Sequence, residues 1–207
     1  MKCYVVQERQ KNVFEEVSYL YKNSRRSIAH WFWDHHVKVV AQKAIILAEK
    51  YNASVDFVFV GALLHDLADV WMERTDVLFE SKSRLKAEKI LRKAGYQHKE
   101  IDTIITQIIE PHSCRLSHLP QILEGKILAS ADALTHLQTD FYQSLKKMGL
   151  PENVLPGNFD EWALGKIEHD FNNKIFFDDE MEQVRKDYER LKELFSRIGL
   201  TLPADGQ

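Results

Sequence analysis

Residues 56–71, DFVFVGALLHDLADVW, are apolar almost all the way round a helix. A helix without a polar face is stable only when other elements cover most of its sides, so this segment predicts a central buried helix. Ser54, just before the apolar run, has the side chain of a helix N-cap. His65 and Asp66 are expected to lie inside the same helix. The chain must therefore build its core around this segment.

Stripes of apolar residues at helical spacing predict the elements that cover it. From Val37 to Tyr51 the apolar positions recur at steps of three and four residues, which indicates one helix. Similar stripes predict helices over residues 13–21, 81–93 (with Leu85 facing inward), 101–109 (ending near Ile109 because of Pro111), 162–177 and 181–198, and one long helix from residue 122 to Gly149. Only 8 glycines and 5 prolines occur among the 207 residues. The expected fold class is all-α.

Charge and cysteine content narrow the class of protein further. The net charge is −3 and no long basic run occurs, so a nucleic-acid polymer is not expected as a partner. Two cysteines are too few for a disulfide framework or a cysteine-rich zinc site. No apolar stretch approaches the ~18 residues of a membrane span, and MKCYVVQERQ at the start lacks the apolar region of a signal peptide. These features predict a cytoplasmic protein with no membrane partner.

We expect three parts along the chain. Residues 1–27 are predicted to form an N-terminal helical arm, residues 28–150 the core, and residues 151–207 a C-terminal helical extension packed on that core. The connector PENVLPGN begins the extension and holds two of the five prolines. The apolar stripe over residues 181–198 predicts a docking helix, and a dimer seam is the alternative, so the chain is expected to be a monomer or a homodimer.

Four polar side chains fall where the pattern requires apolar core. His65 and Asp66 interrupt the central apolar segment, His36 stands beside the start of the stripe that begins at Val37, and Asp132 has apolar neighbours in the predicted long helix. Burying an imidazole or a carboxylate is costly unless the group is paired or binds a metal ion. Two imidazoles and two carboxylates directed into one core are therefore expected to contact one another or a common metal ion.

Three segments, WDHHVKVVAQKAIILAEKY, GALLHDLADVW and ILASADAL, resemble the HD-domain superfamily of metal-dependent phosphohydrolases. The resemblance covers roughly residues 30–136. TQIIEPHSCR and the charged C-terminal helix also resemble small stand-alone members that hydrolyse nucleotides. The resemblance implies an HD-domain helical bundle with a C-terminal helical extension.

The resemblance also implies a set of metal ligands. They are His36, His65, Asp66 and Asp132. The first falls on His36 rather than His35, because Val40 and Ala41 match the helix that follows it in the family. A mixed imidazole and carboxylate shell suits Mn²⁺, Fe²⁺, Co²⁺, Ni²⁺, Zn²⁺ or, less well, Mg²⁺. The expected cofactor is one divalent metal ion, with Mn²⁺ favoured.

An ion held by four protein ligands keeps positions open for water and for a phosphate oxygen. We therefore expect hydrolysis of a phosphomonoester, phosphodiester or phosphoanhydride bond in a small phosphorylated substrate, with a nucleotide favoured. Two alternatives stay open: a non-hydrolytic iron-dependent oxygenase of the same fold, and a regulatory or ligand-binding HD domain without turnover. Degenerate relatives commonly lose ligands, so the intact set counts against the second alternative.

Asp69 is the candidate general base. It follows Asp66 by three residues and His65 by four, so on a helix it shares their face. In related members an acidic residue at this offset orients or deprotonates the water, which is the role that the resemblance implies here. The alternative is that Asp69 caps the helix or pairs with Arg74.

His112 is the second candidate catalytic residue, because it continues the inward stripe of residues 101–108 past the end of that helix. Three roles are open: a hydrogen bond to the substrate phosphate, a ligand of a second metal ion, or a hydrogen-bonded core histidine. The two-metal branches of the superfamily carry extra histidines. Residues 73–86 contain none, which counts against a two-metal centre.

Candidate substrate contacts are Lys82 and Arg84 for phosphate and Trp33 for stacking on a base. Cations near a metal site are expected where a polyanion binds. The competing interpretation is that Lys82 and Arg84, together with Lys86, form a solvated helix face, and that Trp33 belongs to the core.

Overall fold

The computed structural model describes residues 7–115, 118–150 and 158–196, and no β-strand occurs in these ranges, which confirms the all-α class. The helices are α1 (Glu8–Lys22), α2 (Ser27–Phe32), α3 (Lys38–Lys50), α4 (Val55–Leu64), α5 (Phe79–Lys93), α6 (His98–Asp102), α7 (Leu123–Gln138), α8 (Phe141–Met148), α9 (Phe159–Asn173) and α10 (Asp178–Ser196). The π-helical segments η1 (Trp33–Val37) and η3 (Thr103–Ile109) and the 3-10 turns η2 (Leu67–Val70) and η4 (Glu110–Ser113) connect several of them. Within the same ranges, no helix has the length and apolarity needed to cross a bilayer.

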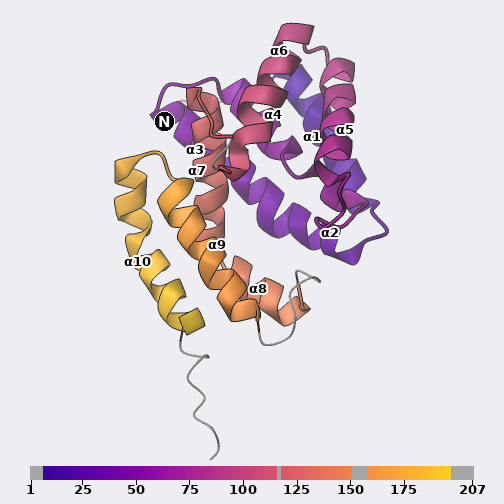
Figure 1. The fold of residues 1–207 in the computed structure, drawn as a ribbon. Helices are drawn as coiled ribbons and strands as arrows, with labels where there is room; N and C mark the ends of the chain where they lie inside the picture. The colour runs from indigo at the N-terminus through magenta and orange to yellow at the C-terminus, as the bar shows by residue number, and fades with distance from the viewer. Residues whose placement is uncertain (1–6, 116–117, 151–157, 197–207) are drawn as a thin grey trace, which may run out of the picture.

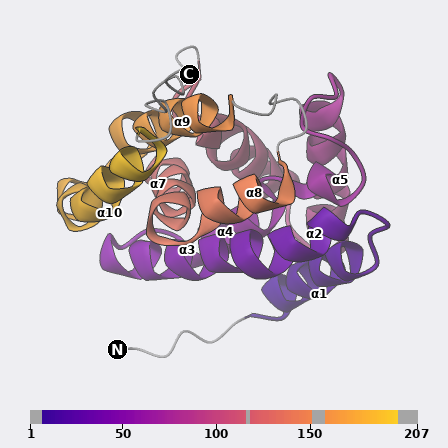
Figure 2. The same cartoon turned by 90° about the horizontal axis from the view of Figure 1, so that it is seen from below.

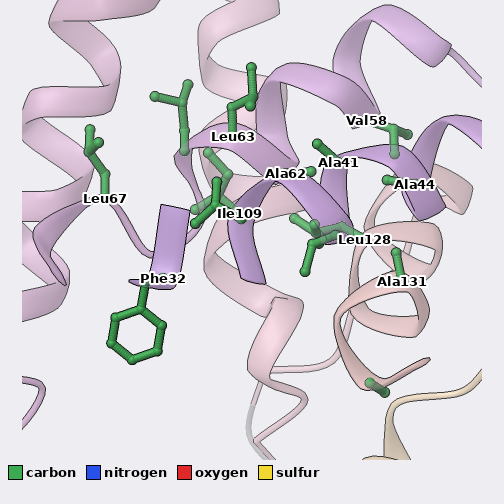
Figure 3. Close-up of a cluster of buried hydrophobic side chains, with 14 of the residues drawn as sticks. Phe32, Ala41, Ala44, Val58, Ala62, Leu63, Leu67, Ile109, Leu128 and Ala131 are labelled. Carbon is green, nitrogen blue, oxygen red and sulfur yellow. The ribbon is translucent and has the colours of Figure 1, made fainter. Parts of the chain in front are cut away.

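Helices α3, α4 and α7 pack against one another at the centre (Figure 1). Helix α1 packs on α4, whereas α9 and α10 pack on α7 (Figure 2). Ala41, Ala62 and Ala131, one from each central helix, lie in the same buried cluster (Figure 3), where their small side chains let the backbones approach closely. In α10, Val184 and Leu191 are fully buried, as expected of a docking helix. Residues 151–157 of the predicted connector lie outside the described ranges.

The helix that carries His36 is continuous from α2 through η1 to α3. Its predicted stripe is confirmed, because Val37, Val40 and Ala44 are fully buried. The widened π-helical turn η1 itself holds His36. Such turns interrupt the regular hydrogen-bond ladder and occur frequently at functional sites.

The central apolar helix is shorter than expected. Ser54 caps α4 as predicted, accepting a hydrogen bond from the Phe57 amide, but the helix ends at Leu64. The prediction that His65 and Asp66 lie inside it is wrong: Asp66 has φ −120° and ψ 33°, and the chain continues into η2. The Asp66 carbonyl accepts two hydrogen bonds, one from the Tyr21 hydroxyl at 3.1 Å and one from the Asp69 amide at 3.1 Å.

Four further expectations need correction. The predicted long helix breaks between α7 and α8 at Thr139, whose side-chain hydroxyl donates to the Thr135 carbonyl and occupies an acceptor at the helix end. Leu85 is 48% exposed on α5 and does not face the core. The π-helical segment does end at Ile109, but the chain then makes the 3-10 turn η4, which includes Pro111. The helix predicted over residues 162–177 is α9, which begins and ends earlier.

Gly125 holds α7 close to η3. A Cβ atom at this position would lie 2.4 Å from the Gln107 carbonyl oxygen and 3.0 Å from Pro120 Cβ. Gly125→Ala is therefore expected to lower the free energy of unfolding by about 1–3 kcal/mol, because backbone must move.

Gly165 in α9 provides the matched control, because a Cβ there would meet nothing within 4 Å. Gly165→Ala should keep the free energy of unfolding unchanged or raise it by up to about 1 kcal/mol through helix propensity. Urea denaturation of both variants measures the difference. Equal stabilities would contradict the close approach of α7 to η3.

Candidate metal centre

The structure brings the four expected ligands together from separate elements. His36 comes from η1, His65 and Asp66 from the turn between α4 and η2, and Asp132 from α7. The His36 Nε2 atom lies 3.2 Å from His65 Nε2 and 3.4 Å from Asp132 Oδ1. The His65 Nε2 atom lies 3.3 Å from Asp66 Oδ2. All four residues are buried, whereas the neighbouring His35 is exposed.

The donor atoms of this cluster fit a divalent cation. Asp132 Oδ1 is buried and has no hydrogen-bond partner, although it faces three imidazole Nε2 atoms. Donor atoms around an ion with bond lengths of ~2.1 Å are separated by about 3.0–3.4 Å in octahedral or tetrahedral geometry. The separations in the cluster are close to these values. A cation at the centre would complete the contacts that the side chains do not make with one another.

The surroundings of the two histidines differ: burial acts to lower the pKa of His65, but Asp66 and Asp132 raise it above its usual value, whereas His36 is held neutral. His65 Nδ1 is 2.7 Å from the Ala62 carbonyl oxygen, to which it donates, so its Nε2 atom is free to accept. Burial lowers the pKa of His36 to about 3, even though Asp66 and Asp132 act to raise it. A neutral imidazole is the form that binds metal.

Both carboxylates are held in their charged form. Burial alone would raise the pKa of Asp66, but the Arg74 guanidinium and His65 lower it well below its usual value. Burial would likewise raise the pKa of Asp132, but His136 and Lys174 lower it well below the usual range. The cluster therefore presents two negative charges, which a divalent cation would neutralise.

Asp69 lies one 3-10 turn beyond Asp66, and its amide donates to the Asp66 carbonyl at 3.1 Å. Arg74 contacts both carboxylates: its Nη2 atom lies 2.6 Å from Asp66 Oδ2 and 2.6 Å from Asp69 Oδ2. Burial and the nearby Asp66 raise the pKa of Asp69 to about 6, although Arg74 acts to lower it. Asp69 thus lies beside the cluster, as the role of general base requires. It also pairs with Arg74, which is the alternative that the sequence left open.

His112 reaches the edge of the cluster, as its place in the stripe indicated. Its Nε2 atom is 3.8 Å from Asp66 Oδ1, and its ring centroid is 5.1 Å from that of His65. The Nδ1 atom donates to the Ile109 carbonyl at 2.6 Å. Burial lowers the pKa of His112 to about 4, so the ring is neutral at neutral pH.

Sequence reasoning missed a second layer of polar residues behind Asp132. Lys174 is 2% exposed, and its Nζ atom is ion-paired with Asp132 Oδ2. The His136 Nε2 atom is 3.4 Å from Asp132 Oδ1. The signal available in the sequence was spacing: His136 follows Asp132 by four residues, and Lys174 follows Asp170 by four. No feature of the nearby sequence indicated that the Asp132–His136 pair contacts the Asp170–Lys174 pair.

The three residues that the sequence suggested as substrate contacts do not line the buried cluster. Trp33 is 2% exposed and stacks on the Tyr21 ring at 5.5 Å, so the prediction that it stacks on a base is wrong. The indole ring of Trp33 is packed against other core side chains and has no free face for a base. Lys82 is exposed, and the exposed Arg84 reaches Glu110 at 3.5 Å. Both lie on the solvated face of α5.

A cavity of about 230 Å³ opens beside Asp69 and Arg74. Its walls combine aromatic, aliphatic and charged side chains. Among the described residues, the lining consists of Arg26, Ile28, Phe32, Asp69, Arg74, Thr75, Phe141, Leu145, Leu150, Trp162 and Lys166. The sequence had singled out Trp33 near His36, but Phe141 and Trp162 come from α8 and α9, which approach the cluster only in the folded chain.

Comparisons with known proteins agree with this architecture. A family model for the HD domain matches residues 33–137. The crystal structure of Bacillus subtilis YpgQ in complex with ADP has a TM-score of 0.62 and 20% identity, over 96% of this chain and 98% of that one. The crystal structure of selenomethionine YpgQ has a TM-score of 0.60 and 20% sequence identity, over 96% of this chain and 97% of that one. A tRNA (cytidine(56)-2'-O)-methyltransferase of Thermoplasma volcanium is 32% identical over 114 residues, 48% of this chain, and the match spans 30% of that enzyme.

Proposed function

The chain belongs to the HD-domain family, and we propose that it is a divalent-metal-dependent phosphohydrolase whose substrate is a small phosphorylated metabolite, preferably a nucleotide. The observation that carries the proposal is the convergence of His36 Nε2, His65 Nε2 and the unpartnered Asp132 Oδ1 in the buried core. Asp66 adds a second carboxylate to this group. Mn²⁺ is the favoured ion for such a mixed set of donors.

These four side chains would hold the ion at the inner end of the site. A divalent cation bound there supplies Lewis acidity, which lowers the pKa of a water molecule and neutralises charge on a phosphoryl group. Arg74, which is partly exposed and lies on the cavity wall, offers a guanidinium to phosphate oxygens. His112 is neutral at the edge of the cluster, and because its Nδ1 atom donates to the Ile109 carbonyl, its Nε2 atom can accept a hydrogen bond from a water molecule or from a protonated phosphate oxygen of the substrate.

Asp69 is the proposed general base. It lies on the cavity wall, is 2% exposed, and is separated from the ligand Asp66 by one 3-10 turn. Arg74 fixes its orientation by bonding both carboxylate oxygens. A carboxylate held rigidly beside the ion-binding atoms is suited to orient a water molecule and to accept its proton.

Asp69→Asn is expected to lower kcat by about 10²–10⁴-fold, because the amide cannot accept the proton. Metal affinity should change little, since the ligand atoms remain. Steady-state kinetics and Mn²⁺ titration of the same preparation measure both quantities. Asp76→Asn, an exposed substitution in the following loop, is the matched control. Wild-type turnover in Asp69→Asn would remove Asp69 from the mechanism.

The cavity supports a nucleotide as substrate. Phe32, Phe141 and Trp162 provide aromatic faces for a base, whereas Arg26 and Lys166 add positive charge to that of Arg74. The structural neighbour YpgQ was crystallised with ADP, which is consistent with a ligand of this chemical class in a related fold. A substrate with an aromatic base and a phosphate chain would contact both kinds of wall.

The test is a substrate panel with added Mn²⁺. Nucleoside mono-, di- and triphosphates are compared with ribose 5-phosphate and pyrophosphate, and both phosphate and pyrophosphate release are measured. We expect turnover of nucleotides, with at least tenfold lower kcat/KM for ribose 5-phosphate because it lacks a base. Faster turnover of ribose 5-phosphate would overturn the nucleotide assignment. No turnover of any compound by Mn²⁺-loaded protein would overturn the phosphohydrolase assignment.

A further inference from the structure

His136 lies one helical turn beyond Asp132 on α7 and faces the same cluster. Its ring stacks on that of His36, with centroids 5.0 Å apart and an interplanar angle of 9°. The ring is 4% exposed. His36, Asp132 and His136 each offer a ligand atom within 4.8 Å of the other two. The imidazole therefore lies at the wall of the proposed metal centre, beyond the four residues that the family pattern indicated.

Asp170 on α9 sets the orientation of His136. The His136 Nδ1 atom donates to Asp170 Oδ2 at 2.9 Å, and the Tyr142 hydroxyl donates to the same oxygen at 2.6 Å. The other oxygen, Oδ1, lies 3.4 Å from the Lys166 Nζ atom and 3.8 Å from the Lys174 Nζ atom. A carboxylate that accepts the Nδ1 proton of a histidine leaves the Nε2 atom as an electron-pair donor, which is how such pairs prepare metal ligands.

Two electron-pair donors then face each other across a buried gap. His136 Nε2 is 3.4 Å from Asp132 Oδ1, and Asp132 Oδ1 has no hydrogen-bond partner. The other oxygen of Asp132 is held by Lys174, so Oδ1 is the one directed toward the histidines. Two facing lone pairs without a proton between them repel, and a cation placed between them removes the repulsion.

We propose that His136 is a fifth protein ligand of the divalent cation, acting through Nε2, and that Asp170 is its positioning residue. The inference rests on the proposed metal centre but not on its hydrolytic activity. Three imidazoles with two carboxylates favour Fe²⁺, Co²⁺, Ni²⁺ or Zn²⁺ over Mg²⁺, because imidazole nitrogen is a softer donor than oxygen.

The experiment is nuclear magnetic resonance of the full chain labelled with ¹⁵N in its histidine rings, titrated with Zn²⁺. Long-range ¹H–¹⁵N spectra report the tautomer and the metal coordination of each ring. We expect His136 to carry its proton on Nδ1 in the metal-free protein, and the Nε2 signals of His36, His65 and His136 to move to metal-bound values. Because the wild-type chain is observed, the result does not depend on the folding of a variant.

Zn²⁺ affinity, measured by competition with a chromophoric chelator, provides the second readout. His136→Gln and the isosteric Asp170→Asn are each expected to weaken binding by about 10–100-fold. His35→Gln is the matched control, since His35 is exposed next to the ligand His36. Asp170→Asn should also disturb the His136 tautomer, an effect that a purely structural loss would not produce.

The possible failures are distinguishable. Metal-bound shifts at His36 and His65 alone, with unchanged affinity in His136→Gln, would overturn the role of His136 and support the four-ligand centre. A His136 ring that is protonated on both nitrogens, and stays so with Zn²⁺, would also overturn it. Absence of a shift at every histidine would overturn both this inference and the proposed metal centre.

Discussion

Asp66→Ala is expected to abolish divalent-cation binding and to lower phosphate release by at least about 10³-fold, a loss of about 4 kcal/mol of transition-state stabilisation. Asp66 supplies one of the carboxylates of the cluster, with Oδ2 3.3 Å from His65 Nε2 and 3.8 Å from His36 Nε2. Without it the remaining donors carry a single negative charge, which is a poor match for a divalent ion.

The fold is expected to survive this change. Arg74 retains its two bonds to Asp69, and the Tyr21 hydroxyl bonds the backbone carbonyl of residue 66, which the substitution keeps. Far-ultraviolet circular dichroism and Mn²⁺ titration measure fold and binding separately. Asp34→Ala is the matched control, because Asp34 is exposed and forms a surface ion pair with Lys38. If the variant loses its helical spectrum, the His65–Asp66 pair is structural.

Lys174→Met is expected to have the largest effect on stability. Its Nζ atom is ion-paired with Asp132 and lies 3.8 Å from Asp170, and the side chain is 2% exposed. Burial alone would lower the pKa of Lys174, but the two carboxylates raise it above its usual value, so the lysine is charged. Removing it leaves buried negative charge uncompensated, which costs about 3–5 kcal/mol.

Urea denaturation of the metal-free protein measures this loss. Lys192→Met provides the control, since Lys192 pairs with Glu168 at the surface, where an ion pair contributes about 0–1 kcal/mol. Added Mn²⁺ should restore part of the stability of Lys174→Met, because a cation at Asp132 Oδ1 replaces some of the missing positive charge. A loss as small as that of Lys192→Met would show that Asp132 does not depend on Lys174.

Local periodicity predicted which faces of the helices are buried. The stripe of Val37, Val40 and Ala44 turns inward, and the same register turns His36 inward and its neighbour His35 outward. Periodicity carries this information because an amphipathic helix has only one stable orientation toward the core. The resemblance to the HD domain then named His36 as the ligand, and the structure places its Nε2 atom within 4 Å of a nitrogen or oxygen atom of each of the other three residues.

Helix ends were harder to predict because they depend on distant partners. The central helix ends before His65, and the Asp66 carbonyl bonds the hydroxyl of Tyr21, 45 residues away in sequence. The break at Thr139 brings Phe141 to 4.0 Å from the His136 ring and onto the wall of the cavity. Tyr21 is not visible in a local window of sequence around Asp66.

By itself, the sequence determined the all-α class and the inward direction of His36, His65, Asp66 and Asp132, because buried faces follow from the spacing of apolar residues. Only the tertiary structure decided how these charges are compensated. Lys174, 42 residues from Asp132 in sequence, reaches it because α9 packs on α7. The free energy of a buried charge depends on which atoms lie within a few ångströms of it, and that is set by the packing of whole helices.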